Sequence, residues 1–154
     1  MGESNEVSID VAASPEAVYA MVADLPRMGE WSPECVRCDW LGGATAATPG
    51  AKFRGRNRIG FRRWSTTGTV VTASPGEELT FDVTSVFGLP VARWTYRISA
   101  DGNGGSTVVE RWEERRGRLL KFLGLLASGV GERTEHNMAG MRATLARIKA
   151  TAEA

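Results

Sequence analysis

Hydrophobic and polar positions alternate along most of the chain, and this pattern predicts most of its elements. Val7, Ile9 and Val11 alternate with polar neighbours, which is the period of a strand with one buried face. Ser14 then offers an N-cap, and Pro15 suits the first position of a helix. We therefore expect a strand followed directly by a short helix.

A second short helix and a long run of strands follow. Asp24 and Pro26 repeat the start signals of the first helix, an N-cap residue and a proline in the first turn. They predict a second short helix that ends near Trp31. Residues 36–115 show only strand patterns, separated by turn signals rich in glycine and proline. These patterns predict six strands, each with one apolar face.

The tail of the chain, residues 132–152, changes to the period of a helix. Met138, Met141, Leu145 and Ile148 recur at intervals of three and four residues, which predicts one amphipathic helix. The chain is thus of the α+β class, with seven strands in all. A curved antiparallel sheet whose inner face is too large for its own side chains can close by gripping this helix. We expect a single domain over residues 1–154, with an interior that need not be solid.

An apolar segment, LLKFLGLLASGV, precedes the long helix. Gly129 and Gly131 argue against one continuous helix, because a glycine inside a helix costs about 1 kcal/mol relative to alanine, so we expect a separate turn or loop. The segment contains Lys121 and Gly124 and is shorter than the roughly 20 residues that span a bilayer. We expect plain packing over the open end of the sheet. Capping of that end, or brief contact with a membrane surface, are the alternatives.

Composition and charge exclude several classes of protein. The 154 residues are 42% hydrophobic and 24% charged, with a formal net charge of +1. A charge so close to zero gives no general attraction to nucleic acids or acidic membranes. No charged segment followed by an apolar one opens the sequence, so we expect a cytoplasmic protein rather than an exported one.

Four stretches carry a resemblance to a known family. They are VSIDVAASPEAVYAMVADLPRMGEWSPE, PGAKFRGRNRIGFRRW, GTVVTASPGEELTFDV and HNMAGMRATLARIKA, in this order over nearly the whole chain. With them the chain resembles the SRPBCC superfamily, also called START-like, helix-grip or birch-pollen-allergen-like proteins, and within it the polyketide cyclase/dehydrase and lipid-transport group. The resemblance implies a helix-grip fold with a deep cavity between the sheet and the long helix. It also implies that the cavity holds an apolar or aromatic small molecule.

Both cysteines lie in the stretch WSPECVRCDW, with two residues between them. Structural zinc sites need four nitrogen or sulfur ligands, and beyond Cys35 and Cys38 the chain offers only His136. The pair leads into a strand rather than the helix N-terminus typical of redox-active pairs. In extended chain, about 3.3 Å per residue places their α-carbons roughly 10 Å apart, beyond disulfide reach and with side chains on opposite faces. We therefore expect two small hydrophobic residues, one lining the cavity and the other facing outward.

Aromatic and polar residues on the predicted inner faces are candidates for ligand binding. A ligand cavity needs apolar walls and a few fixed polar groups. The chain has five tryptophans, and core packing accounts for at least two of them. The ligand-binding candidates are Trp31, Phe53, Asn57, Trp64, Phe81, Val83, Trp94, Tyr96, Glu110, Trp112, Asn137, Met138 and Met141.

The last predicted strand, within STVVERWEERR, carries charge on both faces. If Trp112 points inward then Glu110 does too, and a buried carboxylate would have a raised pKa suited to proton transfer. The alternative is a solvated or salt-bridged carboxylate near the mouth of the cavity. Candidates for a catalytic role are Glu110, Arg111 and Asn137. No serine–histidine–aspartate order, phosphate loop or paired-carboxylate motif accompanies them.

A basic run with strand spacing follows the turn at Pro49 and Gly50. Its residues are Lys52, Arg54, Arg56, Arg58, Arg62 and Arg63. Most of these side chains are expected on a solvated outer face, and an acidic partner or ligand head group is the alternative. His136 is expected to be an exposed helix residue. We expect a hydrophobic small-molecule ligand, with no nucleic acid, no stable membrane insertion, no cofactor and no metal, in a monomer or homodimer.

Three functions fit these features. The first is binding, with transport or modification as extensions, of a hydrophobic or aromatic small molecule such as a lipid or polyketide. The second is an aromatic polyketide cyclase/dehydratase, in which a polar residue of the cavity moves a proton. The third is a protein-interaction domain of the chaperone-activator type, which would use the basic outer strand. The sequence leaves open whether there is turnover.

Overall fold

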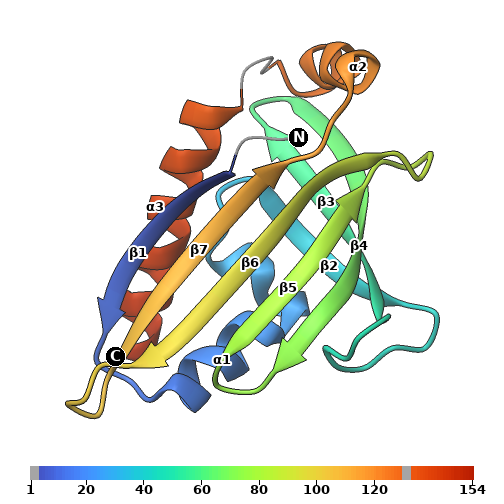
Figure 1. Ribbon diagram of the computed structural model, residues 1–154. Coiled ribbons are helices and arrows are strands. Elements are labelled where there is room, and N and C mark those ends of the chain that lie inside the picture. Colours follow the sequence, from blue (N-terminus) through green and yellow to red (C-terminus); the bar gives the residue numbers. More distant parts are fainter. Residues whose placement is uncertain (1–3, 130–132) are drawn as a thin grey trace.

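The computed structural model describes residues 4–129 and 133–154. In chain order, the elements are β1 (Ser4–Val11), α1 (Pro15–Ala23), the 3-10 helix η1 (Leu25–Glu30), β2 (Cys35–Leu41), β3 (Lys52–Ile59), β4 (Arg62–Ser74), β5 (Glu78–Thr84), β6 (Pro90–Ala100), β7 (Ser106–Glu114), α2 (Arg118–Ser128) and α3 (Thr134–Ala152). The seven strands form one antiparallel sheet in the order β1-β7-β6-β5-β4-β3-β2. The sheet curves around α3, which lies behind β1 and β7 (Figure 1). This is the α+β helix-grip fold that the sequence predicts.

Both predicted short helices are present after β1. The hydroxyl of Ser14 accepts a hydrogen bond from the amide of Ala17, which satisfies one of the free amides at the start of α1. Pro15 occupies the first position of that helix, where no backbone donor is needed. The second element, η1, buries Leu25 and Met28 against the interior.

Strict alternation holds along β3 and β7. On β3, Phe53, Gly55 and Asn57 are buried, and the residues between them face solvent. On β7, every second residue from Ser106 to Glu114 is buried. The outward position predicted for the basic run is therefore confirmed for the exposed residues Lys52, Arg54, Arg56 and Arg58.

Among the described residues, the long helix α3 begins at Thr134. The predicted start at Glu132, and Gly131 with it, lie outside the described residues. The predicted stripe packs inward except for Met138, which is only partly buried. The helix packs mainly against β1.

The apolar segment before α3 forms the helix α2 rather than the turn or loop that we expect from its glycines. Gly129 ends this helix with a positive φ of 78°, a conformation that glycine adopts without steric cost. The predicted separation from α3 is thus confirmed at Gly129. Within residues 4–129 and 133–154, no helix has the length and apolar character needed to cross a bilayer.

Aliphatic side chains fill the end of the interior that α1 closes. Val18, Leu25, Leu79, Val108 and Ile148 each have a relative exposure of 0%. They come from α1, η1, β5, β7 and α3, so one compact cluster joins the sheet to the helices on its concave side. Figure 1 shows that α2 lies at the opposite end of the molecule from α1.

Candidate functional site

A cavity of about 730 Å³ occupies the other end of the interior, between the concave face of the sheet, α3 and α2. Sites for small molecules commonly measure about 300–1,000 Å³. Most of the predicted ligand-binding residues line it, namely Phe53, Asn57, Trp64, Phe81, Val83, Trp94, Tyr96, Glu110, Trp112, Asn137 and Met141.

Three predicted site residues do not line the cavity. Trp31 belongs to the packed core, with 1% of its surface exposed, and the guanidinium of Arg27 lies 4.9 Å from the centre of its ring. Arg111 lies at an outward position of β7, because alternation turns it away from the face that carries Glu110. Met138 is partly buried beside the lining residues without joining them. The structure thus places these three residues outside the cavity lining.

Glu110 and Tyr96 form a buried polar pair in the cavity wall. They face each other across β7 and β6, and the hydroxyl of Tyr96 donates a hydrogen bond to Oε1 of Glu110 over 2.9 Å. Both side chains are 2% exposed. The second carboxyl oxygen, Oε2, is buried and has no hydrogen-bond partner within the part of the chain that the structure describes.

Burial controls the protonation of this pair. Loss of hydration raises the pKa of Glu110 to about 8, although the hydrogen bond from Tyr96 acts in the opposite direction. Burial also raises the pKa of Tyr96 well above its ordinary value, and the neighbouring carboxyl adds to the effect. At neutral pH, the site therefore holds a mostly uncharged carboxyl group with one oxygen free to bond a guest. Of the two alternatives for this strand, the structure has the inward one: Trp112 and Glu110 are both buried on the cavity side, and Glu110 is not a solvated carboxylate.

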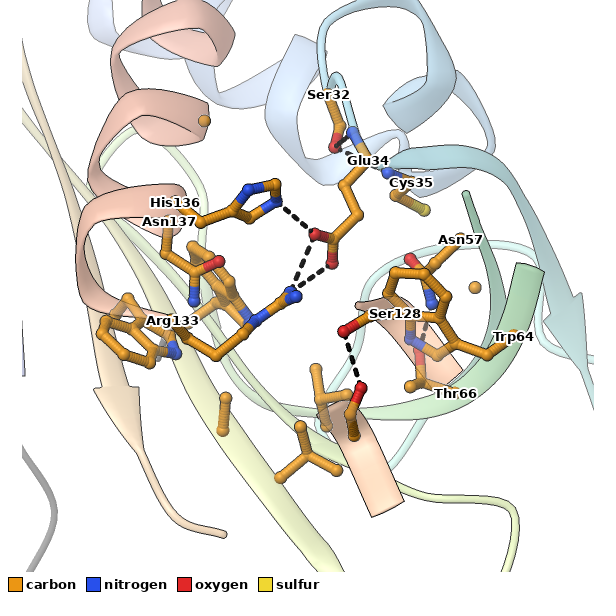
Figure 2. Close-up of a pocket in the computed structure, with 18 of the residues that line it drawn as sticks. Ser32, Glu34, Cys35, Asn57, Trp64, Thr66, Ser128, Arg133, His136 and Asn137 are labelled. Carbon is orange, nitrogen blue, oxygen red and sulfur yellow. Dashed lines mark hydrogen bonds and ion pairs between the residues drawn. The ribbon is translucent and has the colours of Figure 1, made fainter. Parts of the chain in front are cut away.

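A second polar cluster joins the segment before β2 to the start of α3. The guanidinium of Arg133 contacts both carboxylate oxygens of Glu34, at 2.6 and 2.8 Å. Nε2 of His136 lies 2.9 Å from Oε1 of the same carboxylate. Figure 2 shows Glu34 reaching across the pocket toward the two basic side chains. All three line the cavity.

This cluster keeps Glu34 ionised although the carboxylate is largely buried. Burial alone would raise the pKa of Glu34, but hydrogen bonding to His136 and the charge of Arg133 hold it below its ordinary value. His136 is therefore a half-buried member of a polar cluster, and the expectation of a freely exposed helix residue is wrong. The sequence contains no signal for the cluster, because Glu34 and Arg133 are 99 residues apart.

The two cysteines lie on the same side of β2, contrary to the prediction. A β-bulge between Cys35 and Arg37 places one extra residue in this strand, so residues three apart share a face. The sulfur atoms of Cys35 and Cys38 are 3.3 Å apart, and both side chains line the cavity. Opposite Cys38 lies Gly55 on β3, where an added Cβ would come 3.6 Å from the sulfur of Cys35 and 3.9 Å from that of Cys38.

Helix α2 lies over the open end of the cavity. Leu120, Leu123 and Gly124 line the space beneath it, and Arg62 from the start of β4 donates a hydrogen bond to the carbonyl of Leu126. This position agrees with the prediction that the apolar segment packs over the open end of the sheet. On the same helix, the exposed large hydrophobic residues are Leu119, Phe122, Leu123, Leu125 and Leu126.

A nearly buried ion pair lies close to α2. The side chains of Glu114 and Arg116 are 10% and 7% exposed, and their closest charged atoms are 2.7 Å apart. A Cβ added at Gly124 would lie 2.9 Å from Nη1 of Arg116, so the glycine lets α2 approach the ion pair closely. Both charged residues line the cavity, which gives its mouth a more polar character than its walls.

Comparison with known proteins identifies relatives in sequence and in structure. The family model described as polyketide cyclase / dehydrase and lipid transport matches residues 4–153. No curated protein matches the chain significantly in sequence. The Polyketide_cyc-like protein Cgl2372 from Corynebacterium glutamicum is 29% identical, with a TM-score of 0.58 and coverage of 97% of this chain and 90% of its own.

Two further solved structures share the fold. Protein CV1439 from Chromobacterium violaceum is 16% identical, with a TM-score of 0.74 and 98% of each chain covered. The di-domain ARO/CYC StfQ from the steffimycin biosynthetic pathway is also 16% identical, with a TM-score of 0.72. That match covers 99% of this chain and 51% of StfQ. At these identities, the two likenesses show the fold alone.

Proposed function

The chain belongs to the polyketide cyclase/dehydrase and lipid transport family, and we propose that it binds a hydrophobic or aromatic small molecule, such as a lipid or polyketide, in the cavity. The observation that carries this proposal is the space of about 730 Å³ beside a fully packed core. Protein interiors are normally filled to the density of organic crystals. A hollow of this size is therefore a built feature, suited to a guest of matching shape and polarity.

Aromatic side chains make the walls suitable for a ring-containing guest. Phe53 and Phe81 pack edge to face, with ring centres 5.3 Å apart, and Trp94 and Trp112 line the same space. Burial of apolar surface contributes about 25 cal/mol per Å², and rigid aromatic faces provide this surface with little loss of side-chain freedom. We expect most of the affinity to come from these walls.

Glu110 would select the polar group of the guest. When the pH is below its pKa of about 8, the carboxyl group of Glu110 is mostly protonated and can donate a hydrogen bond. A ketone or hydroxyl oxygen is a matching acceptor. A charged group at the same depth would lose its hydration without gaining an opposite charge, which is strongly unfavourable. The ligand should therefore be uncharged where it meets Glu110 and Tyr96.

A second candidate function is that of an aromatic polyketide cyclase/dehydratase, and the unpaired oxygen of Glu110 favours it. A carboxyl group with a pKa near neutrality can both give and take a proton at working pH. Asn137 on α3 is 7% exposed, lines the cavity, and offers an amide that can hold a carbonyl oxygen. In this reading, the walls fold a poly-β-ketone chain while Glu110 moves a proton.

Titration with Nile red, an uncharged aromatic fluorophore, tests the binding proposal. Val83 on β5 lines the cavity, so Val83→Trp should fill it and weaken binding at least about tenfold, in line with the roughly 1.4 kcal/mol that a tenfold change represents. Val71 on β4 is 39% exposed and lies outside the lining, so Val71→Trp is the matched control and should bind as the wild type does. Equal binding by both variants would place the probe on the outer surface and overturn the proposal.

The enzymatic alternative requires a separate measurement with a poly-β-ketone thioester. Glu110→Gln preserves the shape of the side chain but cannot transfer a proton. It should leave Nile red affinity within about threefold while lowering any turnover by about a hundredfold, the usual scale of acid–base catalysis. Turnover that survives the substitution would rule out this role for Glu110.

A further inference from the structure

The cysteine pair is a chemically distinct feature of the cavity wall. The two sulfur atoms are 3.3 Å apart, whereas a disulfide bond measures about 2.05 Å. A small movement of the side chains would therefore bring them to bonding distance. On β3, Gly55 lies opposite Cys38 and presents no side chain to the two sulfur atoms, whereas Asn57 lies opposite Cys35. The bulge and the glycine together create a place for two thiols that simple strand geometry would keep apart.

The two thiols differ in access and in acidity. Cys35 is partly exposed, whereas Cys38 is 3% exposed. Hydrogen bonding to the Cys38 thiol lowers the pKa of Cys35, although burial opposes this effect. Hydrogen bonding to Cys35, together with burial, raises the pKa of Cys38. Since the thiolate is the reactive form, Cys35 is suited to react first and Cys38 to react second.

We propose that Cys35 and Cys38 form a reversible modification site in the cavity wall that reacts with small disulfide compounds and closes to an intramolecular disulfide. This site is independent of the identity of the cavity's guest. It also differs in position from the Glu110–Tyr96 pair, since it is carried by β2 rather than by β6 and β7.

The reaction proceeds by two exchanges. The Cys35 thiolate attacks one sulfur of the small disulfide, forms a mixed disulfide and releases one thiolate of the reagent. Cys38 then loses its proton and attacks the sulfur of Cys35, which forms the internal disulfide and releases the second thiolate. Two cysteine thiols are oxidised and one reagent disulfide is reduced to two thiols, which take up the two protons. The second step is intramolecular and is favoured by the short distance between the sulfurs.

Oxidised glutathione provides the test on the full folded chain. The protein is equilibrated with glutathione buffers of increasing oxidised fraction, trapped with N-ethylmaleimide under denaturing conditions and weighed by intact mass spectrometry. We expect the wild type to lose about 2 Da, the two thiol hydrogens, and to carry neither glutathione nor N-ethylmaleimide. Dithiothreitol should restore both thiols.

Two variants and one unfolded sample test the order of events. Cys38→Ser should accumulate glutathione on Cys35, whereas Cys35→Ser should react about tenfold more slowly because its remaining thiol is buried. The folded wild type should also become half oxidised at a buffer at least about tenfold more reducing than the urea-unfolded chain requires, since the bulge holds the sulfurs together. The wild-type result decides the matter even if a variant fails to fold.

Three results would overturn the proposal. The first is a wild type that retains two alkylatable thiols in buffers that oxidise the unfolded chain. The second is a stable glutathione adduct or a disulfide-linked dimer in place of the internal bond. The third is equal oxidation of the folded and unfolded chains, which would show that the spacing along the sequence, rather than the folded geometry, brings the thiols together.

Discussion

The two ends of the interior are built from the same strands but packed differently. At the end closed by α1, β5 contributes Leu79 to a core in which it has no exposed surface. Four residues further along the same face of β5, Val83 borders the cavity and is only partly buried. The strand pattern does not change between them. The difference comes from the covering elements, α1 at one end and α2 at the other.

This contrast separates stability from function within one sheet. The packed end is aliphatic, whereas the hollow end carries aromatic walls and the buried polar groups Glu110, Asn137 and Thr144. A buried polar atom without a hydrogen bond reduces stability, and Oε2 of Glu110 is such an atom among the described residues, which indicates that this end is shaped for a guest. The packed end supplies the stability that offsets the cost of the cavity at the hollow end.

Alanine substitutions on β5 should show the largest difference between the two ends. Leu79→Ala should lower the free energy of unfolding by about 2–5 kcal/mol, because it removes fully packed methyl groups and leaves a void. Val83→Ala should lower it by less than about 1 kcal/mol, since it only enlarges an existing space. Urea unfolding measures both values. A loss at Val83 as large as that at Leu79 would show that the second end is packed as well.

The hollow end should also make the stability of the protein depend on pH, because it buries the carboxyl group of Glu110. Its pKa is about 8 in the folded chain, against 4.5 for an ordinary glutamate, so the folded state binds the proton more tightly. Relative to Glu110→Gln, the wild type should therefore lose stability as the pH rises from about 5 to about 8, by at most about 1.4 kcal/mol per pH unit. The substitution serves as the control, because other carboxyl groups titrate alike in both proteins.

Urea unfolding of the two proteins across this pH range provides the measurement. The difference in their free energies of unfolding should change steadily and level off above the pKa of the folded state. Parallel curves would show that the carboxyl group of Glu110 is not held in its protonated form by burial.

Charge reversal on the outer face of the sheet should have the smallest effect on stability. Arg56 and Arg58 are exposed on β3, so Arg56→Glu and Arg58→Glu together should change the free energy of unfolding by no more than about 0.5 kcal/mol. Nile red affinity should stay the same for Arg56→Glu alone, because Arg58 also borders the cavity whereas Arg56 does not. A protein-interaction function through the basic strand predicts instead that the double variant loses a partner captured by the wild type, which a pull-down comparison of the two proteins measures.

The sequence predicts the fold and most of the aromatic residues of the cavity wall, because alternation is local. Once Trp112 is taken to face inward, a period of two residues also turns Glu110 inward, and the structure agrees. The same rule fails on β2, where the bulge adds a residue and brings Cys35 and Cys38 to one face. A bulge depends on pairing with the neighbouring strand, which the residues of β2 alone do not reveal.

Contacts between distant segments are the other limit of the sequence. Glu34 meets Arg133 only because α3 folds back across the sheet, and no local pattern marks the pair. In the same way, the helical stripe does not tell which of Asn137 and Met138 faces the cavity. That choice depends on how α3 rotates against β1 and β7, and only Asn137 lines the space.

Native mass spectrometry of the full chain purified from its own host tests the central claim most directly. If the hollow end holds a guest, the wild type should carry one extra small-molecule mass per chain, which disappears on denaturation and in Val83→Trp but persists in Val71→Trp. A bare wild-type mass that also stays bare after incubation with Nile red, or an extra mass retained equally by Val83→Trp, would contradict the account.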